Sequence, residues 1–157
     1  MTTQSIHKLE IKLHNPGEIK IAIVASCWNA DVIQRMITAA TTSLTKHGIL
    51  KNNIIIKRVP GAYELPLGVL MLAEQENITA CVALGCVVKG DTRHDEYINH
   101  AVAKALMDIM LKTKKPIGFG LLTTETQAQA DDRSGGCHGN KGDEAADAVL
   151  SMLQSFY

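Results

Sequence analysis

Four apolar runs alternate with longer stretches of mixed polarity along this chain of 157 residues. The apolar runs cover residues 19–26, 53–59, 80–88 and 116–123, and each is followed by a segment with helical features. We predict helices over about 30–47, 65–76, 93–113 and 125–134, and a last helix near 142–155. Strands that alternate with helices build βαβ units around a parallel sheet. The pattern therefore predicts an α/β fold, a three-layer sandwich with a four-stranded parallel sheet.

The length favours a single domain, since a chain of this size buries about two-thirds of its unfolded surface. No internal repeat or low-complexity linker divides the sequence. Residues 1–18 are polar and irregular, and we expect them to form an arm or to add an edge strand, including one received from a neighbouring subunit. Residues 19–157 are then the α/β domain.

The charge balance removes several classes of partner. Lys plus Arg and Asp plus Glu both number 16, and no basic run is interleaved with aromatic residues, so we expect no nucleic-acid partner. The chain has no run of about 18 apolar residues and no basic-then-apolar signal segment. We expect a cytoplasmic protein without a membrane partner.

The glycine motifs of nucleotide-binding proteins are missing from the sequence. Neither G-x-G-x-x-G nor the P-loop motif is present, which disfavours dinucleotide and P-loop nucleotide binding.

The cysteines at 27, 81, 86 and 137 have neither C-x-x-C nor zinc-finger spacing, so we expect free thiols in a reducing compartment. Cys86 is conceivable as a nucleophile at a strand end, but a small buried hydrophobic residue is the favoured interpretation. Cys137 and His138 would need further ligands from elsewhere to bind a metal, and the sequence nominates none. No metal site is predicted.

Ligands of open parallel sheets bind outside the carboxyl ends of the strands. That rule selects the loops at residues 26–29, 60–64, 89–94 and 123–125. Trp28 and Tyr63 could stack on a flat heterocycle there, or could be peripheral core residues. Glu64 could bind a ligand, or could be a helix-start acid favoured by the helix dipole.

Residues 83–97 combine an apolar strand with a helix start. Gly90 permits a turn, Thr92 is a good N-cap, and Asp95 is a weaker form of the capping-box acid. The free N–H groups of such a turn attract phosphate. His94 lies in the first helical turn, and histidine ordinarily exchanges protons near neutral pH. The alternative is a solvated or capping histidine at a turn that binds nothing.

Several motifs in one order together resemble a known family. Residues 59–66, VPGAYELP, are similar to V-P-G-A-[FY]-E-[IL]-P, and residues 90–97, GDTRHDEY, are similar to G-x-T-x-H-[FY]-[DE]-Y. The remaining signature follows without a gap at residues 116–120, Thr123, Thr124, Arg133 and 139–142. Residues 19–155 thus resemble the 6,7-dimethyl-8-ribityllumazine synthase family of riboflavin biosynthesis.

The resemblance implies a flavodoxin-like sandwich and a transferase-class enzyme. Its reaction condenses 5-amino-6-(D-ribitylamino)uracil with 3,4-dihydroxy-2-butanone 4-phosphate and releases phosphate and two waters. No metal or organic cofactor is implied. The partners implied are these two small molecules and further copies of the chain, in a homopentamer or a multiple of pentamers.

The resemblance also implies the roles of individual residues. His94 shuttles protons and Trp28 stacks on the pyrimidine ring. The residues that line the ribityl side are Ala62, Tyr63 and Glu64, and those whose backbone meets the ring edge are Cys86, Val87 and Val88. The phosphate is bound by Asp91, Thr92 and Arg133. Phe119 and Arg133 reach the site from a neighbouring subunit. Lys141 adds positive charge or fixes the helix break at 135–142.

Three positions depart from the family pattern. Asp95 replaces an aromatic residue, Asp91 puts a carboxylate on the phosphate loop, and Trp28 replaces the more frequent phenylalanine. The larger Trp28 face could also accept a flavin. The rival functions are a non-catalytic lumazine or flavin binding module and an unrelated phosphate-binding protein.

Overall fold

The computed structural model describes residues 10–157, so the first nine residues of the expected N-terminal arm lie outside the described part. Four strands form one sheet in the order β2-β1-β3-β4, and every pairing is parallel. The strands are β1 (Ile21–Ser26), β2 (Ile54–Val59), β3 (Ala80–Val88) and β4 (Ile117–Thr124). The predicted α/β class and the four-stranded parallel sheet are confirmed.

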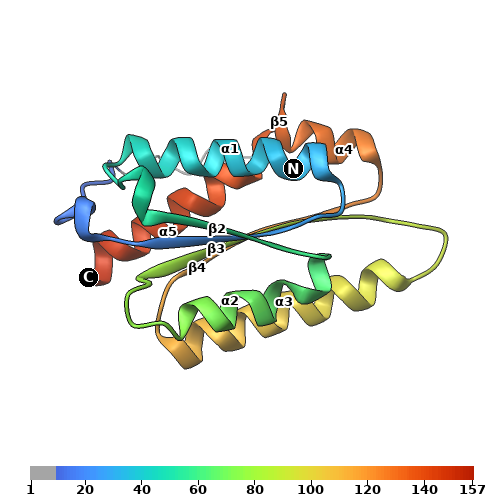
Figure 1. Cartoon of the computed structure of the whole chain (residues 1–157). Coiled ribbons are helices and arrows are strands. Elements are labelled where there is room, and N and C mark those ends of the chain that lie inside the picture. Colours follow the sequence, from blue (N-terminus) through green and yellow to red (C-terminus); the bar gives the residue numbers. More distant parts are fainter. Residues whose placement is uncertain (1–9) are drawn as a thin grey trace.

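Helices cover both faces of the sheet, which gives three layers (Figure 1). One face carries α1 (Ala30–Lys46) and α5 (Lys141–Phe156), and the other carries α2 (Leu65–Ala73) and α3 (His94–Thr113). The shorter elements are α4 (Gln127–Asp132), the hairpin strands β5 (Ser134–Gly136) and β6 (Gly139–Asn140), and the 3₁₀ turns η1 (Pro16–Glu18), η2 (Lys51–Asn53) and η3 (Ala62–Glu64).

The central strands divide the core into two halves because their side chains alternate between faces. On β1, Ile21, Ile23 and Ala25 pack toward α1 and α5, while Ala22 and Val24 pack toward α2 and α3. All five side chains are fully buried. Burial on both faces explains why the sequence shows continuous apolar runs rather than alternating polarity.

Two predicted helices were too long. The helix predicted over 65–76 ends at Ala73, where the chain turns toward β3. The helix predicted over 125–134 ends at Asp132, because Ser134 already belongs to an antiparallel hairpin that the sequence did not predict. Positive φ angles at Gly135 and Gly139, 119° and 82°, let the chain reverse within these few residues.

The predicted N-cap at Thr92 is wrong. Helix α3 begins at His94, its N-cap is Arg93, and no side chain caps it by a hydrogen bond. Thr92 comes one residue too early to reach the first turn as an N-cap does, and it lies exposed in the loop after β3. The acids Asp95 and Glu96 in the first turn complement the helix dipole instead.

Part of the N-terminal segment contacts the domain. Ile11 and Leu13 are partly buried against the core half formed with α1 and α5, and the Lys12 N–H donates to Gln154 Oε1 at 2.8 Å. Among the helices of residues 10–157, none combines the length and the apolarity that crossing a bilayer requires.

The start of α5 crosses α1 so closely that only glycine fits at position 142. A Cβ built on Gly142 would lie 2.1 Å from the Met36 carbonyl oxygen, and this is backbone that cannot rotate away. Replacing glycine by alanine inside a helix ordinarily stabilises it by about 1 kcal/mol. Here the steric overlap of the new Cβ with the Met36 backbone costs about 1–3 kcal/mol or more, which outweighs that gain. We expect Gly142→Ala to lower the free energy of unfolding by about 2 kcal/mol, measured from the urea midpoint.

Gly90→Ala is the control, because nothing lies within 4 Å of a Cβ built there. It should change the free energy of unfolding by less than about 0.5 kcal/mol. A Gly142→Ala protein as stable as this control would contradict the close approach of α5 to α1.

Candidate functional site

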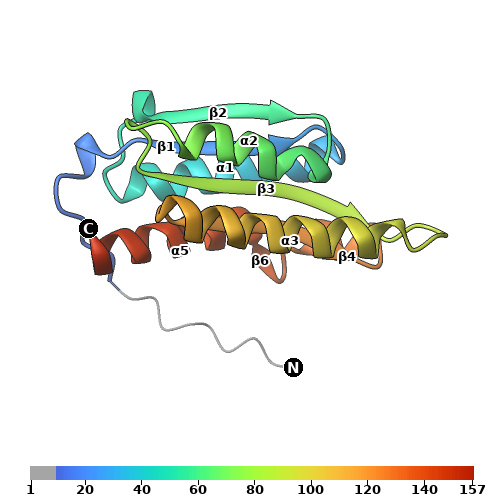
Figure 2. The same cartoon turned by 90° about the horizontal axis from the view of Figure 1, so that it is seen from below.

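Three loops leave the sheet at the carboxyl ends of the strands. They span residues 27–29 after β1, 60–61 after β2 and 89–93 after β3, and the last projects beyond the rest of the molecule (Figure 2). The Cys27 N–H donates to the Val59 carbonyl at 2.9 Å, which ties the first loop to the second. The sheet thus fixes the base of the region that the strand-end rule selects.

Trp28 and Tyr63 are not core residues of the chain. Their exposed fractions are 73% and 65%, which is high for aromatic side chains. The Trp28 indole lies beside Gly61, where an added Cβ would be 3.4 Å from indole Cδ1. The loops therefore present a flat aromatic face next to an open backbone, and Cys27, Asn29, Ala30 and Pro60 line a shallow pocket with the indole.

Glu64 lies at a helix start, as one of its two predicted roles requires, and its side chain also caps the turn. Its Oε2 accepts a hydrogen bond from the Gly61 N–H at 2.9 Å, which closes the turn before η3. The buried Ala62 anchors the same turn in the core. This bond occupies one carboxylate oxygen at the edge of the pocket and holds the carboxylate in place.

Asn29 joins two strand ends, and the sequence did not single it out. Its side-chain amide donates to the Cys86 carbonyl at 2.9 Å, and its φ of 55° is left-handed. Asparagine tolerates this conformation better than most residues, and this was the available signal. The bond fixes the carboxyl end of β3 against the loop that carries Trp28.

Cys86 is 3% exposed, and Val87 and Val88 are half-buried at the end of the same strand. Burial raises the pKa of the Cys86 thiol to about 11, with a smaller contribution from Asp131. The thiol is protonated near neutral pH, so the buried hydrophobic interpretation is supported and the nucleophile interpretation is not. The four cysteines are free, as predicted.

His94 is the first residue of α3 and is exposed at the end of the projecting loop. Asp91 and Thr92 are exposed beside it. Arg93 is paired with Glu96 at 2.8 Å. Asp95 points inward, and its Oδ1 is buried without a hydrogen-bond partner in residues 10–157. The loop therefore offers exposed backbone and an imidazole to a ligand.

Arg133 follows α4 and is held in an ion-pair cluster. Its guanidinium donates to the His138 carbonyl and lies 3.0 Å from the Glu144 carboxylate, and Lys141 Nζ lies 3.2 Å from the same carboxylate. Partial burial would raise the pKa of Glu144, but hydrogen bonds and charges from Arg133 and Lys141 outweigh it and hold that pKa below its usual value. The sequence missed Glu144, although its i,i+3 spacing from Lys141 on α5 was a usable signal.

Lys141 fits both interpretations left open by the sequence. Its ammonium adds charge to this cluster, and its N–H donates to the Arg133 carbonyl at 2.8 Å where the hairpin passes into α5. Arg35 supports the same segment, with Nε 3.1 Å from the buried Ser134 Oγ and Nη2 2.5 Å from Asp131. The backbone around Arg133 is thus fixed on both sides.

Phe119 lies on the edge strand β4, paired with Ala83, and is 43% exposed. In the strand order β2-β1-β3-β4, β3 stands between β4 and β1, the strand that the Trp28 loop follows. A single chain therefore brings together the loops of Trp28, Glu64 and Cys86, with His94 on the next loop. Phe119 belongs to the opposite edge of the sheet. Arg133 lies outside the sheet, between Asp131 and Ser134, which both bond to Arg35 of α1.

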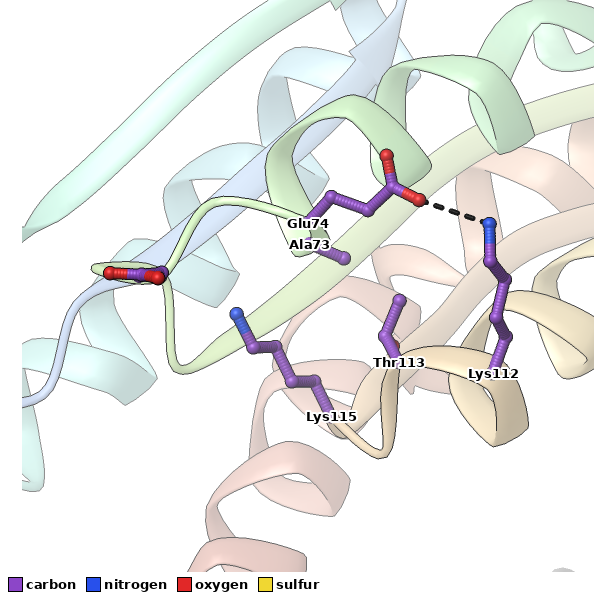
Figure 3. Close-up of a pocket in the computed structure, with 6 residues that line it drawn as sticks. Ala73, Glu74, Lys112, Thr113 and Lys115 are labelled. Atoms are coloured by element: carbon purple, nitrogen blue, oxygen red, sulfur yellow. Dashed lines mark hydrogen bonds and ion pairs between the residues drawn. The ribbon is translucent and has the colours of Figure 1, made fainter.

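A second pocket lies at the other end of the sheet, where α2 and α3 end (Figure 3). Glu74 and Lys112 form an ion pair of 3.0 Å across it, and Lys115 Nζ donates to the Gln75 carbonyl at 2.7 Å. None of the predicted site residues lines it.

Comparison with known proteins identifies the family. The model of the 6,7-dimethyl-8-ribityllumazine synthase family matches residues 18–156. The 6,7-dimethyl-8-ribityllumazine synthase of Parabacteroides distasonis is 43% identical over 137 residues, which are 87% of this chain and 86% of that protein. Proteins of the same name from Cytophaga hutchinsonii and Rhodopirellula baltica are each 47% identical, over 83% and 86% of this chain and 82% and 87% of their own lengths. This chain belongs to the 6,7-dimethyl-8-ribityllumazine synthase family.

Proposed function

We propose that this chain condenses 5-amino-6-(D-ribitylamino)uracil with 3,4-dihydroxy-2-butanone 4-phosphate to 6,7-dimethyl-8-ribityllumazine, phosphate and water in riboflavin biosynthesis. The observation that carries the proposal is the Trp28 face beside Gly61 and the Glu64 carboxylate, one loop from His94. The reaction requires a site that binds a flat ring and a polyhydroxy chain and that holds a proton shuttle nearby.

The uracil substrate binds at the first two loops. Trp28 stacks on the pyrimidine ring, and the turn of Ala62, Tyr63 and Glu64 lines the ribityl chain. The backbone of residues 86–88 meets the ring edge. The Asn29 bond to the Cys86 carbonyl supports this arrangement, because it fixes the β3 end next to the Trp28 loop.

The phosphate of the second substrate binds at the projecting loop. The backbone N–H groups at Asp91 and Thr92 and at the uncapped start of α3 are suited to an anion. Arg133 completes the site with two N–H donors, the geometry in which guanidinium binds phosphate best. The Asp91 side chain must point away from the anion.

His94 moves the protons. An imine forms between the uracil's amine and the ketone, phosphate leaves, and tautomerisation and ring closure expel water. Each step needs a proton donor or acceptor within reach, and His94 is exposed at the loop where the phosphate binds. Orientation of the two substrates supplies most of the remaining acceleration.

The complete site requires a second copy of the chain. Phe119 lies on the edge strand β4, which β3 separates from β1 and from the Trp28 loop that follows β1. We propose that Phe119 and Arg133 complete the site of the next subunit in a homopentameric ring or a multiple of it. We also propose that the protein works in the cytoplasm, since its four free thiols suit a reducing compartment.

The direct test mixes the two substrates with the purified protein and follows the absorbance of the lumazine product. Product that forms in step with phosphate release supports the synthase. Binding of lumazine or riboflavin without turnover would replace the proposal by the non-catalytic binding module. Failure to bind the ribityl-uracil would favour an unrelated phosphate-binding protein.

The pyrimidine role of Trp28 has its own optical signal, because Trp28 is the only tryptophan of the chain. Binding of the ribityl-uracil or of riboflavin should quench its emission. Loss of aromatic stacking on a base costs about 1–3 kcal/mol, so we expect Trp28→Ala to bind the ribityl-uracil about 5- to 150-fold more weakly, measured by calorimetry. Trp28→Phe should retain most of the affinity. Emission unchanged by either ligand would contradict the stacking.

A further inference from the structure

The tip of the β5–β6 hairpin gathers three side chains with metal-binding atoms. Cys137 and His138 form its two-residue turn, and Asp132 ends the preceding helix α4. Cys137 Sγ lies 3.3 Å from Asp132 Oδ1 and 3.2 Å from His138 Nδ1, and His138 Nδ1 lies 3.5 Å from Asp132 Oδ2. Three different ligand groups therefore face one point.

The backbone builds this arrangement. A Cβ on Gly136 would lie 2.6 Å from Asp132 Cα and 2.8 Å from its Oδ1, so glycine lets the hairpin fold back against the end of α4. The Arg133 guanidinium donates a hydrogen bond to the His138 carbonyl and so holds the turn against the end of α4. The three side chains meet because of the fold and not through a chance contact of long flexible chains.

The spacing matches a tetrahedral zinc site. Zinc binds sulfur at about 2.3 Å and nitrogen or oxygen at about 2.0–2.2 Å, so two ligand atoms of a tetrahedron lie about 3.3–3.6 Å apart. Sγ to Nδ1 is 3.2 Å, Sγ to Asp132 Oδ1 is 3.3 Å and Nδ1 to Asp132 Oδ2 is 3.5 Å. Because the two carboxylate contacts use different oxygens, binding through one oxygen requires a rotation of the Asp132 carboxylate, and one ligand atom from each residue already lies within 4.8 Å of the other two. Each group is at least partly exposed, which leaves an entry path.

We propose that Asp132, Cys137 and His138 form a binding site for a thiophilic divalent cation, with Zn²⁺ as the reference ion and the fourth position open to water. Thiolate and imidazole select zinc over Mg²⁺ and Ca²⁺, which take oxygen ligands. Binding forms one bond each from sulfur, nitrogen and oxygen, and the Cys137 proton leaves to solvent.

The charges nearby permit the ion. A thiolate and a carboxylate balance the two charges of the cation. The neighbouring Arg133 is itself paired with Glu144 at 3.0 Å. None of the three ligands is a residue to which we give a role in the condensation, so the metal site and the proposed function stand or fall separately.

The test titrates the untagged, chelator-treated protein with Zn²⁺ by calorimetry, and with Co²⁺ by absorption spectroscopy, since a thiolate bound to Co²⁺ gives a charge-transfer band that Zn²⁺ lacks. We expect one ion per chain. Mutation of a residue that only supports a zinc ligand weakens binding about 10- to 100-fold, so Asp132→Asn, Cys137→Ser and His138→Gln should each weaken it at least tenfold. Cys137→Ser should also abolish the Co²⁺ band.

Cys27→Ser is the matched control, since Cys27 is the other exposed cysteine. It should keep the stoichiometry, the affinity and the Co²⁺ band. Stoichiometric zinc binding that survives Cys137→Ser would overturn the proposal, because the ion would then sit elsewhere. Absence of binding at micromolar Zn²⁺ would also overturn it and would reduce the cluster to a hydrogen-bonded turn.

Discussion

Replacement of His94 by glutamine should lower kcat about 10²- to 10⁴-fold, the usual contribution of a positioned general acid and base. Glutamine keeps a similar size and hydrogen-bonding capacity but cannot carry a proton between substrate atoms. The KM values of both substrates should change little, because His94 has no role in ground-state binding. A residual rate should persist, since the two substrates remain held together. Lumazine absorbance under saturating substrates measures the effect.

His100→Gln is the control for this variant. His100 is on the same helix α3 and is exposed, but it lies beyond the first turn, where the phosphate loop ends. Its kcat should equal that of the unmodified protein. A His94→Gln enzyme with full kcat would refute the proton-shuttle role. Equal losses in both variants would point to damage of α3, which circular dichroism would detect.

The sequence predicted the layers of the fold because the parallel strands are buried on both faces. A continuous apolar run such as residues 80–88 is typical of a strand in the centre of a parallel sheet, where helices cover both faces. All four predicted strands and the helices at 30–47, 93–113 and 142–155 are found within a few residues of the expected bounds. The hydrophobic pattern predicts elements of this length well, because a wrong assignment of helix or strand would leave a whole row of apolar side chains exposed to water.

The shorter features depended on geometry that the pattern does not encode. The β5–β6 hairpin consists of small and polar residues around Gly135 and Gly139, which the sequence supported only as a helix break. The N-cap at Thr92 failed because the loop after β3 runs one residue further before α3 begins. Helix ends of this kind are decided by one or two dihedral angles.

The residues of the candidate site also fall into two groups, those that the sequence could predict and those that it could not. Residues at strand ends, such as Trp28 and Tyr63, could be selected from the strand-end rule and are exposed as a ligand site requires. Partners that act through tertiary contact could not. Asn29 reaches Cys86 across 57 positions of sequence, and Glu144 reaches Arg133 across 11, so neither bond leaves a local signal that names both members.

Replacement of Arg133 by alanine should lower kcat/KM for the butanone phosphate about 10²- to 10³-fold, as loss of a preorganised donor to a reacting anion does. Affinity for the ribityl-uracil should change little, because the role assigned to Arg133 is to bind the phosphate of the other substrate. Arg133→Lys should recover part of the loss, since lysine restores the charge without the two-pronged geometry. Steady-state kinetics with each substrate varied in turn measures both effects.

Arg58→Ala, an exposed arginine on β2, is the control and should leave the kinetics unchanged. Glu144 retains Lys141 as a partner after Arg133 is removed, so the fold should survive the substitution. An active Arg133→Ala protein with unaltered affinity for the butanone phosphate would refute the assigned phosphate role.

Mixed assemblies would reveal whether Arg133 acts in the neighbouring subunit. Chains with His94→Gln and chains with Arg133→Ala are each almost inactive alone, but co-expression combines them in one ring. If a site takes His94 from one subunit and Arg133 from the next, random mixing in a cyclic assembly leaves about one quarter of the sites with both residues intact. If both residues act within one chain, no intact site forms. Activity restored to about a quarter in the mixture therefore supports a shared site, and activity no higher than that of the separate variants contradicts it.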